Sequence, residues 1–134
     1  MIVVDTSALM AIALDEPNAD ACDDCLSRQE EILVSAGTLT EAFIVAARRN
    51  VTEALDILLQ NLPYVVVPAT EASARRAGEA YRLWGKGLHP AGLNFGDCFA
   101  YELAKERNFP LLYIGNDFSK TDITGALPAE ARAR

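Results

Sequence analysis

Residues 1–9 read MIVVDTSAL, and this stretch decides the fold. The β-branched residues Ile2, Val3 and Val4 form a short apolar run, which predicts a strand buried on both faces. No basic segment precedes the run and it is soon interrupted, so we do not expect a signal peptide. An acidic residue, Asp5, follows the strand directly. Burying an unpaired carboxylate is unfavourable, so Asp5 needs a partner.

The composition is that of an ordinary globular protein. The chain has 134 residues, of which 51% are hydrophobic and 23% are charged. We expect a single domain over residues 1–134, with a tail from about residue 124 that can be flexible. Three cysteines, an odd number, argue against a disulfide framework and predict a cytoplasmic location. No apolar run approaches the ~20 residues of a membrane span, so no membrane partner is expected.

Short apolar runs alternate with helical patterns along the chain. Such alternation predicts an α/β fold in three layers, with a mainly parallel central sheet of four to five strands and helices on both faces. The expected strands cover residues 2–4, 32–35, 64–67 and 111–114. The expected helices cover residues 7–14, 18–28, about 39–50, 52–62, 70–84 and 95–107, with Ser7 as the N-cap of the first and with Phe95, Phe99 and Leu103 on an inward stripe of the last.

Acidic residues recur where strands end and helices begin. Asp5 ends the first strand, and Glu41 lies in the expected first turn of the helix after the second strand. Asp97 lies in the first turn of a later helix, whereas Asp117 and Asp122 follow the fourth strand. The carboxyl ends of parallel strands meet at one edge of a sheet, so these acids should converge there. A bound divalent cation such as Mg²⁺ or Mn²⁺ would relieve their repulsion.

Each acid also has a structural explanation. The pairs Thr38–Glu41 and Asn94–Asp97 fit helix capping boxes, and Asn116–Asp117 fits an ordinary turn. Asp5 is harder to explain in this way, because no basic residue lies near it in the sequence. The set of acids is therefore more informative than any single member.

The chain carries a net charge of −7, which by itself argues against a nucleic-acid partner. Positive charge is nevertheless concentrated in one segment, where it could follow an RNA backbone or only solvate a helix. This segment contains Arg75, Arg76, Arg82 and Lys86. The pair Arg48–Arg49 is a weaker candidate.

Four blocks of the sequence resemble the acidic motifs of PIN-domain ribonucleases. These blocks are MIVVDTSAL, TLTEA, LNFGDCFAYELA and GNDFSKTDI. The chain is most similar to the VapC-type toxins of bacterial type II toxin–antitoxin pairs, above all in HPAGLNFGDCFAYELAKERNFPLLYIGNDFSKTDI. The resemblance extends from Met1 to about Ile123, which is nearly the whole chain.

The resemblance implies a PIN-like fold and a divalent-metal-dependent endoribonuclease that acts as a toxin on an RNA substrate. It further implies a VapB-like antitoxin partner and a homodimer. The helices around Leu39–Leu62, including Leu55 and Leu58, are candidates for either interface. The implied metal ligands are Asp5, Glu41, Asp97 and Asp117, binding Mg²⁺ or Mn²⁺, with Ser7, Asn116 and Asp122 in supporting positions.

Two other classes of function stay open on the residues alone. One is another acid-based phosphotransfer enzyme, such as a phosphatase or a receiver-like domain. Haloacid-type phosphatases carry a second acid two residues after the first, where this chain has Ser7. The other is a non-catalytic RNA-binding module of the same fold. Several further residues are expected to have structural roles: Cys22 and Cys25 on a helix face, Cys98 in the core, His89 in a loop, and Tyr81 and Trp84 in the core or an interface.

Overall fold

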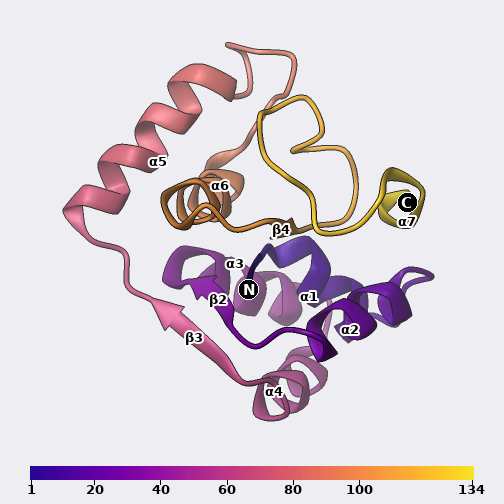
Figure 1. The fold of residues 1–134 in the computed structure, drawn as a ribbon. Helices are drawn as coiled ribbons and strands as arrows, with labels where there is room; N and C mark the ends of the chain where they lie inside the picture. Colours follow the sequence, from indigo (N-terminus) through magenta and orange to yellow (C-terminus); the bar gives the residue numbers. More distant parts are fainter.

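The computed structural model describes residues 1–134 and contains a sheet of four strands in the order β3-β2-β1-β4 (Figure 1). All neighbouring strands are parallel, so the predicted parallel sheet is confirmed. The strands are β1 (Ile2–Val4), β2 (Ile32–Ser35), β3 (Tyr64–Val67) and β4 (Leu111–Leu112), the last shorter than the predicted 111–114.

Alternate residues of the strands face two separate cores. Ile2 and Val4 belong to a core under α1, α2 and α4, whereas Val3 belongs to a core under α5 and α6. Helices therefore cover both faces of the sheet, as predicted (Figure 1). The helices are α1 (Thr6–Ala13), α2 (Ala19–Ser27), α3 (Ala36–Arg48), α4 (Thr52–Gln60), α5 (Glu71–Trp84), α6 (Phe95–Arg107) and α7 (Ala129–Arg132). No helix combines the length and apolar character needed to cross a membrane.

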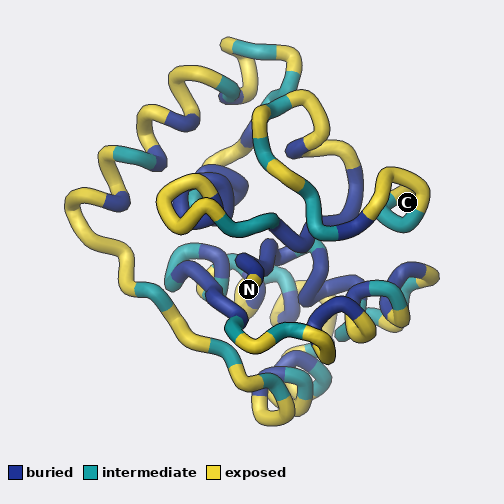
Figure 2. The backbone as a smooth tube through the Cα atoms, viewed as in Figure 1, coloured by how far each residue is buried: buried dark blue, intermediate teal, exposed yellow.

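The strand β3 forms one edge of the sheet and is covered less completely than the others (Figure 2). Val65 and Val66 are 55% and 40% exposed, whereas every residue of β1 and β2 is buried. The two fully buried strands, β1 and β2, are therefore those followed directly by Asp5 and by α3.

The starts of α1 and α3 differ from the sequence-based prediction in their capping. The N-cap of α1 is Asp5 and not Ser7, because the Asp5 side chain accepts the hydrogen bond of the Ser7 amide. The helix α3 begins at Ala36 behind Ser35, which is its N-cap. Glu41 therefore lies in the second turn of α3, and the predicted Thr38–Glu41 capping box is wrong.

The predicted inward stripe of α6 is only partly correct. Leu103 is buried and Phe99 packs across Gly37 of α3, but Phe95 is 80% exposed. Phe95 is the first residue of α6 and lies outside the core under α5 and α6. Helical periodicity alone therefore overestimates its burial.

The chain after β4 returns along the sheet edge. The Leu111 amide donates to the Thr124 carbonyl (2.8 Å), and the Gly115 amide donates to the Arg132 carbonyl (2.8 Å). The Arg132 guanidinium lies over the Tyr113 ring, 4.8 Å from its centroid. These contacts bring Arg134 beside Gly115. The expected flexibility of this tail stays a prediction.

Candidate active site

Five acidic side chains line one cavity at the carboxyl edge of the sheet, which we call the acid cleft: Glu16 and the four acids described next. The cavity has a volume of about 230 Å³. Asp5 follows β1, Glu41 lies on α3, Asp97 lies in the first turn of α6, and Asp117 follows β4. The structure thus brings together four of the five acids that the sequence analysis grouped, although they come from segments far apart in the chain, and Asp122 is the one that it leaves out.

One oxygen of the Asp5 carboxylate accepts hydrogen bonds that fix the side chain, and the other oxygen has no partner. Its Oδ2 accepts hydrogen bonds from the Ser7 amide (3.1 Å) and the Ser7 hydroxyl (2.7 Å). Its Oδ1 is buried and has no hydrogen-bond partner in the protein. Burial raises the pKa of Asp5 to about 6, against the lowering effect of the Ser7 hydrogen bonds. A buried orphan oxygen of this kind is suited to a cation ligand.

Ser7 connects Asp5 to the end of the neighbouring strand. Its hydroxyl donates to Asp5 Oδ2 and accepts from the Ile114 amide at 2.9 Å. The segment after β4 is therefore fixed relative to Asp5. This geometry fits the supporting position that the resemblance implies for Ser7.

Glu41 is held by Thr6, a residue that the sequence analysis did not assign to the site. The Thr6 hydroxyl donates to Glu41 Oε1 at 2.7 Å, and it also lies 3.2 Å from the Thr38 carbonyl. On the other side, Gly96 makes room for the carboxylate, because a Cβ atom there would overlap Glu41 Oε2. Glu41 is thus confined between α1 and the start of α6.

Asp97 takes part in a capping box and in the cleft. Its Oδ2 accepts from the Asn94 amide (3.0 Å), while Asn94 Oδ1 accepts from the Asp97 amide (2.9 Å). The structural explanation from the sequence is therefore confirmed, but it uses only one carboxylate oxygen. Burial, followed by the charges of Asp5, Asp117 and Glu41, raises the pKa of Asp97 to about 7.

The remaining acidic segment divides into two parts. Asp117 is exposed and lines the cleft, while the Asn116 carbonyl accepts from Ser119 in the turn. Asp122 lies elsewhere: it accepts from the Tyr101 hydroxyl at 2.5 Å and pairs with Lys105 at 3.0 Å. Neither Asn116 nor Asp122 lines the acid cleft, so the structure does not bring these two side chains to the four acids.

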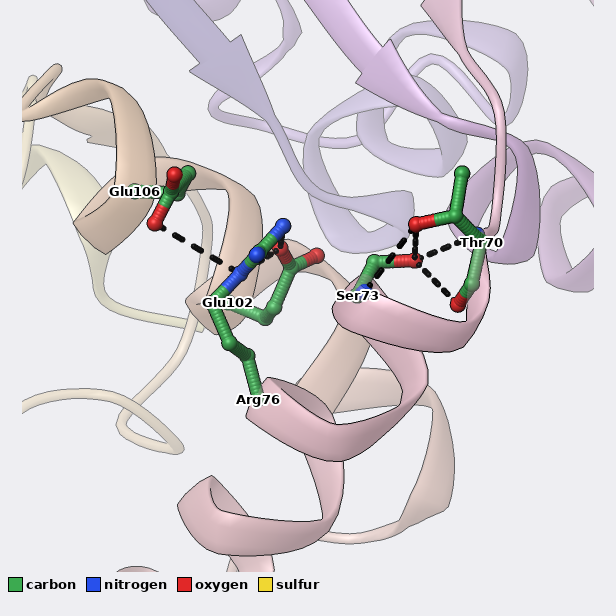
Figure 3. A network of polar contacts seen from close by, with 5 residues as sticks. All are labelled: Thr70, Ser73, Arg76, Glu102 and Glu106. Carbon is green, nitrogen blue, oxygen red and sulfur yellow. Dashed lines mark hydrogen bonds and ion pairs between the residues drawn. The ribbon is translucent and has the colours of Figure 1, made fainter.

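The arginines of α5 each have an acidic partner. Figure 3 shows Arg76 reaching from α5 to Glu102 (2.8 Å) and Glu106 (3.5 Å) on α6. Arg75 pairs with Glu71 at 3.2 Å, and Arg82 pairs with Glu79 at 2.6 Å. Of the four cations predicted to contact RNA, Lys86 alone makes no ion pair. The RNA contact of these four residues stays a prediction, and their paired charges make the arginines weaker candidates.

Two other arginines lie at the acid cleft. Arg49, at the end of α3, and Arg134, beside Gly115, both line it. The sequence analysis ranked Arg49 as a secondary candidate and missed Arg134. Their position beside the acids is suited to contacting a phosphate group.

The other residues singled out in the sequence have structural roles. Cys22 and Cys98 are buried free thiols, and burial raises their pKa values to about 12 and about 11. His89 accepts a hydrogen bond from the Ala91 amide at 3.0 Å and packs against Trp84. The indole N–H of Trp84 donates to the Tyr101 hydroxyl at 2.9 Å. These contacts fit the expectation that the cysteines, the histidine and the tryptophan are structural.

The donor set of the cleft fits a hard divalent cation. The acids of the cleft offer carboxylate oxygens, Asp5 Oδ1 is buried without a partner, and Gly96 leaves space at Glu41. No three His, Cys, Asp or Glu side chains are already arranged to hold a metal ion. Mg²⁺ commonly retains several waters and binds through one or two carboxylates, so a closed protein cage is not required.

Comparisons with known proteins agree with this architecture. The PIN domain family model matches residues 2–123. The ribonuclease VapC28 of Mycobacterium tuberculosis is 45% identical over 130 residues, which cover 94% of this chain and 98% of that protein. The ribonuclease VapC of Mycolicibacterium smegmatis is 41% identical over 127 residues, which cover 91% of this chain and 97% of that protein.

Two crystal structures support the fold. One is Mycobacterium tuberculosis VapC20, described as a sarcin-ricin loop cleaving toxin (TM-score 0.74, 18% identity, covering 92% of this chain and 97% of that chain). The other is VapBC2 from Rickettsia felis bound to a DNA fragment from its promoter (TM-score 0.69, 18% identity, covering 93% and 96%). The fold and the acid cleft define a PIN-domain protein. Within that class, the chain belongs to the VapC family of endoribonuclease toxins.

Proposed function

We propose that this endoribonuclease cuts RNA with Mg²⁺ or Mn²⁺ bound in the acid cleft, and that Asp5, Glu41, Asp97 and Asp117 are its site residues. The observation that carries the proposal is the meeting of four acids from distant segments in one cavity. The unpartnered buried Oδ1 of Asp5 adds to it, because such an oxygen needs a cation or a proton.

The acids of the site and the polar residues beside them have distinct tasks in this proposal. Asp5 and Asp97 would hold the cation through the oxygens that their hydrogen bonds leave free, and Asp117 would complete the ligand set. Ser7 and Thr6 fix the orientation of Asp5 and Glu41. When bound, the cation supplies charge neutralisation at the scissile phosphate and lowers the pKa of a coordinated water. Glu41 positions the attacking water, and Arg49 holds the phosphate.

The partners follow from the VapC family. We infer an antitoxin of the VapB kind and a homodimer in the cytoplasm. Leu55 is fully buried, so it belongs to the core and not to either interface. The exposed apolar residues of the same helices are Phe43 (37%), Ile44 (55%) and Ile57 (53%), and these are better candidates for a protein contact.

The test of the proposed function is expression of the protein in a bacterium, followed by mapping of RNA 5′ ends. The wild type should arrest growth and create new 5′ ends at defined positions. Asp97→Asn should do neither, although the variant folds. Asp56→Asn removes an exposed acid of α4 and is the matched control, which should behave as the wild type. Growth arrest and cleavage that survive Asp97→Asn would overturn the proposal.

A further inference from the structure

A second cavity lies beside the acid cleft, between α5 and α6. Its volume is about 590 Å³, and its lining is mostly hydrophobic, with Ala77, Tyr81, Cys98 and Phe99 among the wall residues. Asn94 lines both this cavity and the acid cleft. The two cavities are therefore neighbours at Asn94, the N-cap of α6.

Phe95 stands at this junction with its ring in solvent. Its exposed fraction of 80% is the highest among the large apolar side chains of the protein. The ring contacts Phe99 edge to face, with centroids 5.1 Å apart and an interplanar angle of 80°. This contact orients the ring and leaves most of its surface free. An exposed, oriented aromatic ring two residues before Asp97 is suited to stacking.

The cavity also has a free positive charge and free space. Lys86 lines it and has no acidic partner, in contrast to the arginines of α5. The Tyr81 hydroxyl donates to the Lys86 carbonyl at 2.9 Å, which fixes the loop that carries the lysine. At Gly78, on the α5 wall, an added Cβ would meet no atom within 4 Å.

We propose that this apolar cavity binds the base of a nucleotide adjacent to the scissile phosphate. The base stacks on Phe95, and Lys86 contacts the phosphate of that nucleotide. The inference rests on the proposed function, since it assumes that RNA enters the acid cleft. An RNA occupant is favoured because the cavity adjoins the cleft at Asn94, its one cation complements a phosphate, and its exposed ring matches the flat face of a base. Single-stranded RNA is commonly read through bases that leave the stack and pack on aromatic side chains.

The test uses a short oligoribonucleotide that spans a mapped cleavage site, with an abasic residue on either side of the cut. For the wild type, loss of the base at one of the two positions should lower kcat/KM by roughly 5- to 150-fold. Phe95→Ala should lower kcat/KM for intact RNA by a similar factor, with no further loss from the abasic residue. Phe95→Tyr keeps an aromatic face and should retain the sensitivity to the missing base.

A second variant tests the cavity without removing any contact. Gly78→Leu adds an apolar side chain to the empty wall, which should block the base and reproduce the effect of Phe95→Ala. Ala72→Leu adds the same side chain at an exposed position of α5 outside the cavity and should cut as the wild type does. Leu83→Ala removes an exposed apolar side chain of α5 outside the cavity and is the control for Phe95→Ala.

The possible outcomes separate the two proposals. Suppose that the wild type cuts RNA, but that a missing base lowers kcat/KM as much for Phe95→Ala and Gly78→Leu as it does for the wild type. The base-binding role is then wrong, and the proposed function stands. If the two substitutions instead change the molar mass of the protein in solution, while the loss of kcat/KM from the missing base stays the same, the cavity is a contact between protein chains. The inference is then also wrong. If the wild type cuts no RNA with Mg²⁺ or Mn²⁺, both proposals fail.

Discussion

Replacing Asp97 by asparagine should stabilise the metal-free protein at high pH, even though it removes a site residue. Asp97 is 5% exposed, and its pKa rises from 3.8 to about 7 because it is buried among other acids. Ionising it in the folded state is therefore unfavourable. Asparagine has no charge to bury, and its side-chain oxygen can still accept the Asn94 amide hydrogen bond of the capping box.

The size and the pH range of this effect follow from the same pKa values. Since the folded-state pKa is raised, the stability linked to Asp97 is fully present below pH 3.8 and is lost as the pH rises through about 7. One pKa unit corresponds to about 1.4 kcal/mol, so the full loss is about 4 kcal/mol at pH 8. Relaxation of the neighbouring acids and burial of the amide reduce this value. We therefore expect Asp97→Asn to be about 2–3 kcal/mol more stable than the wild type at pH 8 and nearly equal at pH 4.

The assay is urea unfolding in EDTA at pH 4, 6 and 8. Asp56→Asn, at an exposed position of α4, is the control and should show no such trend. A hundredfold excess of Mn²⁺ over its Kd at pH 8 should add about 2.7 kcal/mol to the wild type and much less to the variant. Equal destabilisation of Asp97→Asn at all three pH values would refute the reasoning, because it would show that Asp97 acts only as a helix cap.

Three further predictions concern residues that position the site or the fold. Thr6→Val should lower the cleavage rate about 10- to 100-fold, because Glu41 loses its hydrogen-bond donor. Thr6→Ser keeps the hydroxyl and should retain most of the wild-type rate. Equal rates for the two variants would exclude a hydrogen-bonding role for Thr6. Gly96→Ala should reduce cleavage while preserving the far-ultraviolet circular dichroism spectrum, since its Cβ would displace the Glu41 carboxylate; unchanged kinetics would show that Glu41 has room to move. Arg76→Met should destabilise the protein by about 2 kcal/mol at pH 7, because buried Glu102 loses its partner. Burial raises the pKa of Glu102 even with Arg76 present, so the destabilisation by Arg76→Met should shrink at pH 4, where the Glu102 carboxyl is protonated. A loss of stability that became larger at low pH would contradict this reasoning.

The sequence predicted the sheet and the convergence of acids well, because both depend on local patterns. Apolar runs identified the strands, and the rule that parallel strands end at one edge placed Asp5, Glu41, Asp97 and Asp117 together. The N-terminal block was informative in a second way. Asp5 is at once the N-cap of α1 and the acid with an unpartnered oxygen.

Contacts between segments far apart in the sequence could not be predicted in this way. Thr6 reaches Glu41 across 35 positions, and no periodicity indicates such a hydrogen bond. The positive segment of α5 suggested an RNA surface, but Arg76 pairs with Glu102, 26 positions away on α6. Asp122 had the spacing of a site residue, yet the path after β4 carries it to Tyr101 and Lys105.

The most direct test of the account is cleavage of one defined RNA by purified protein, measured in EDTA and after addition of Mn²⁺. The account predicts no cleavage in EDTA, cleavage at fixed positions when Mn²⁺ is added in excess, and none by Asp97→Asn under either condition. Cleavage by the wild type in EDTA, or by Asp97→Asn at the same positions and rate, would contradict the claim that the acid cleft binds the catalytic metal.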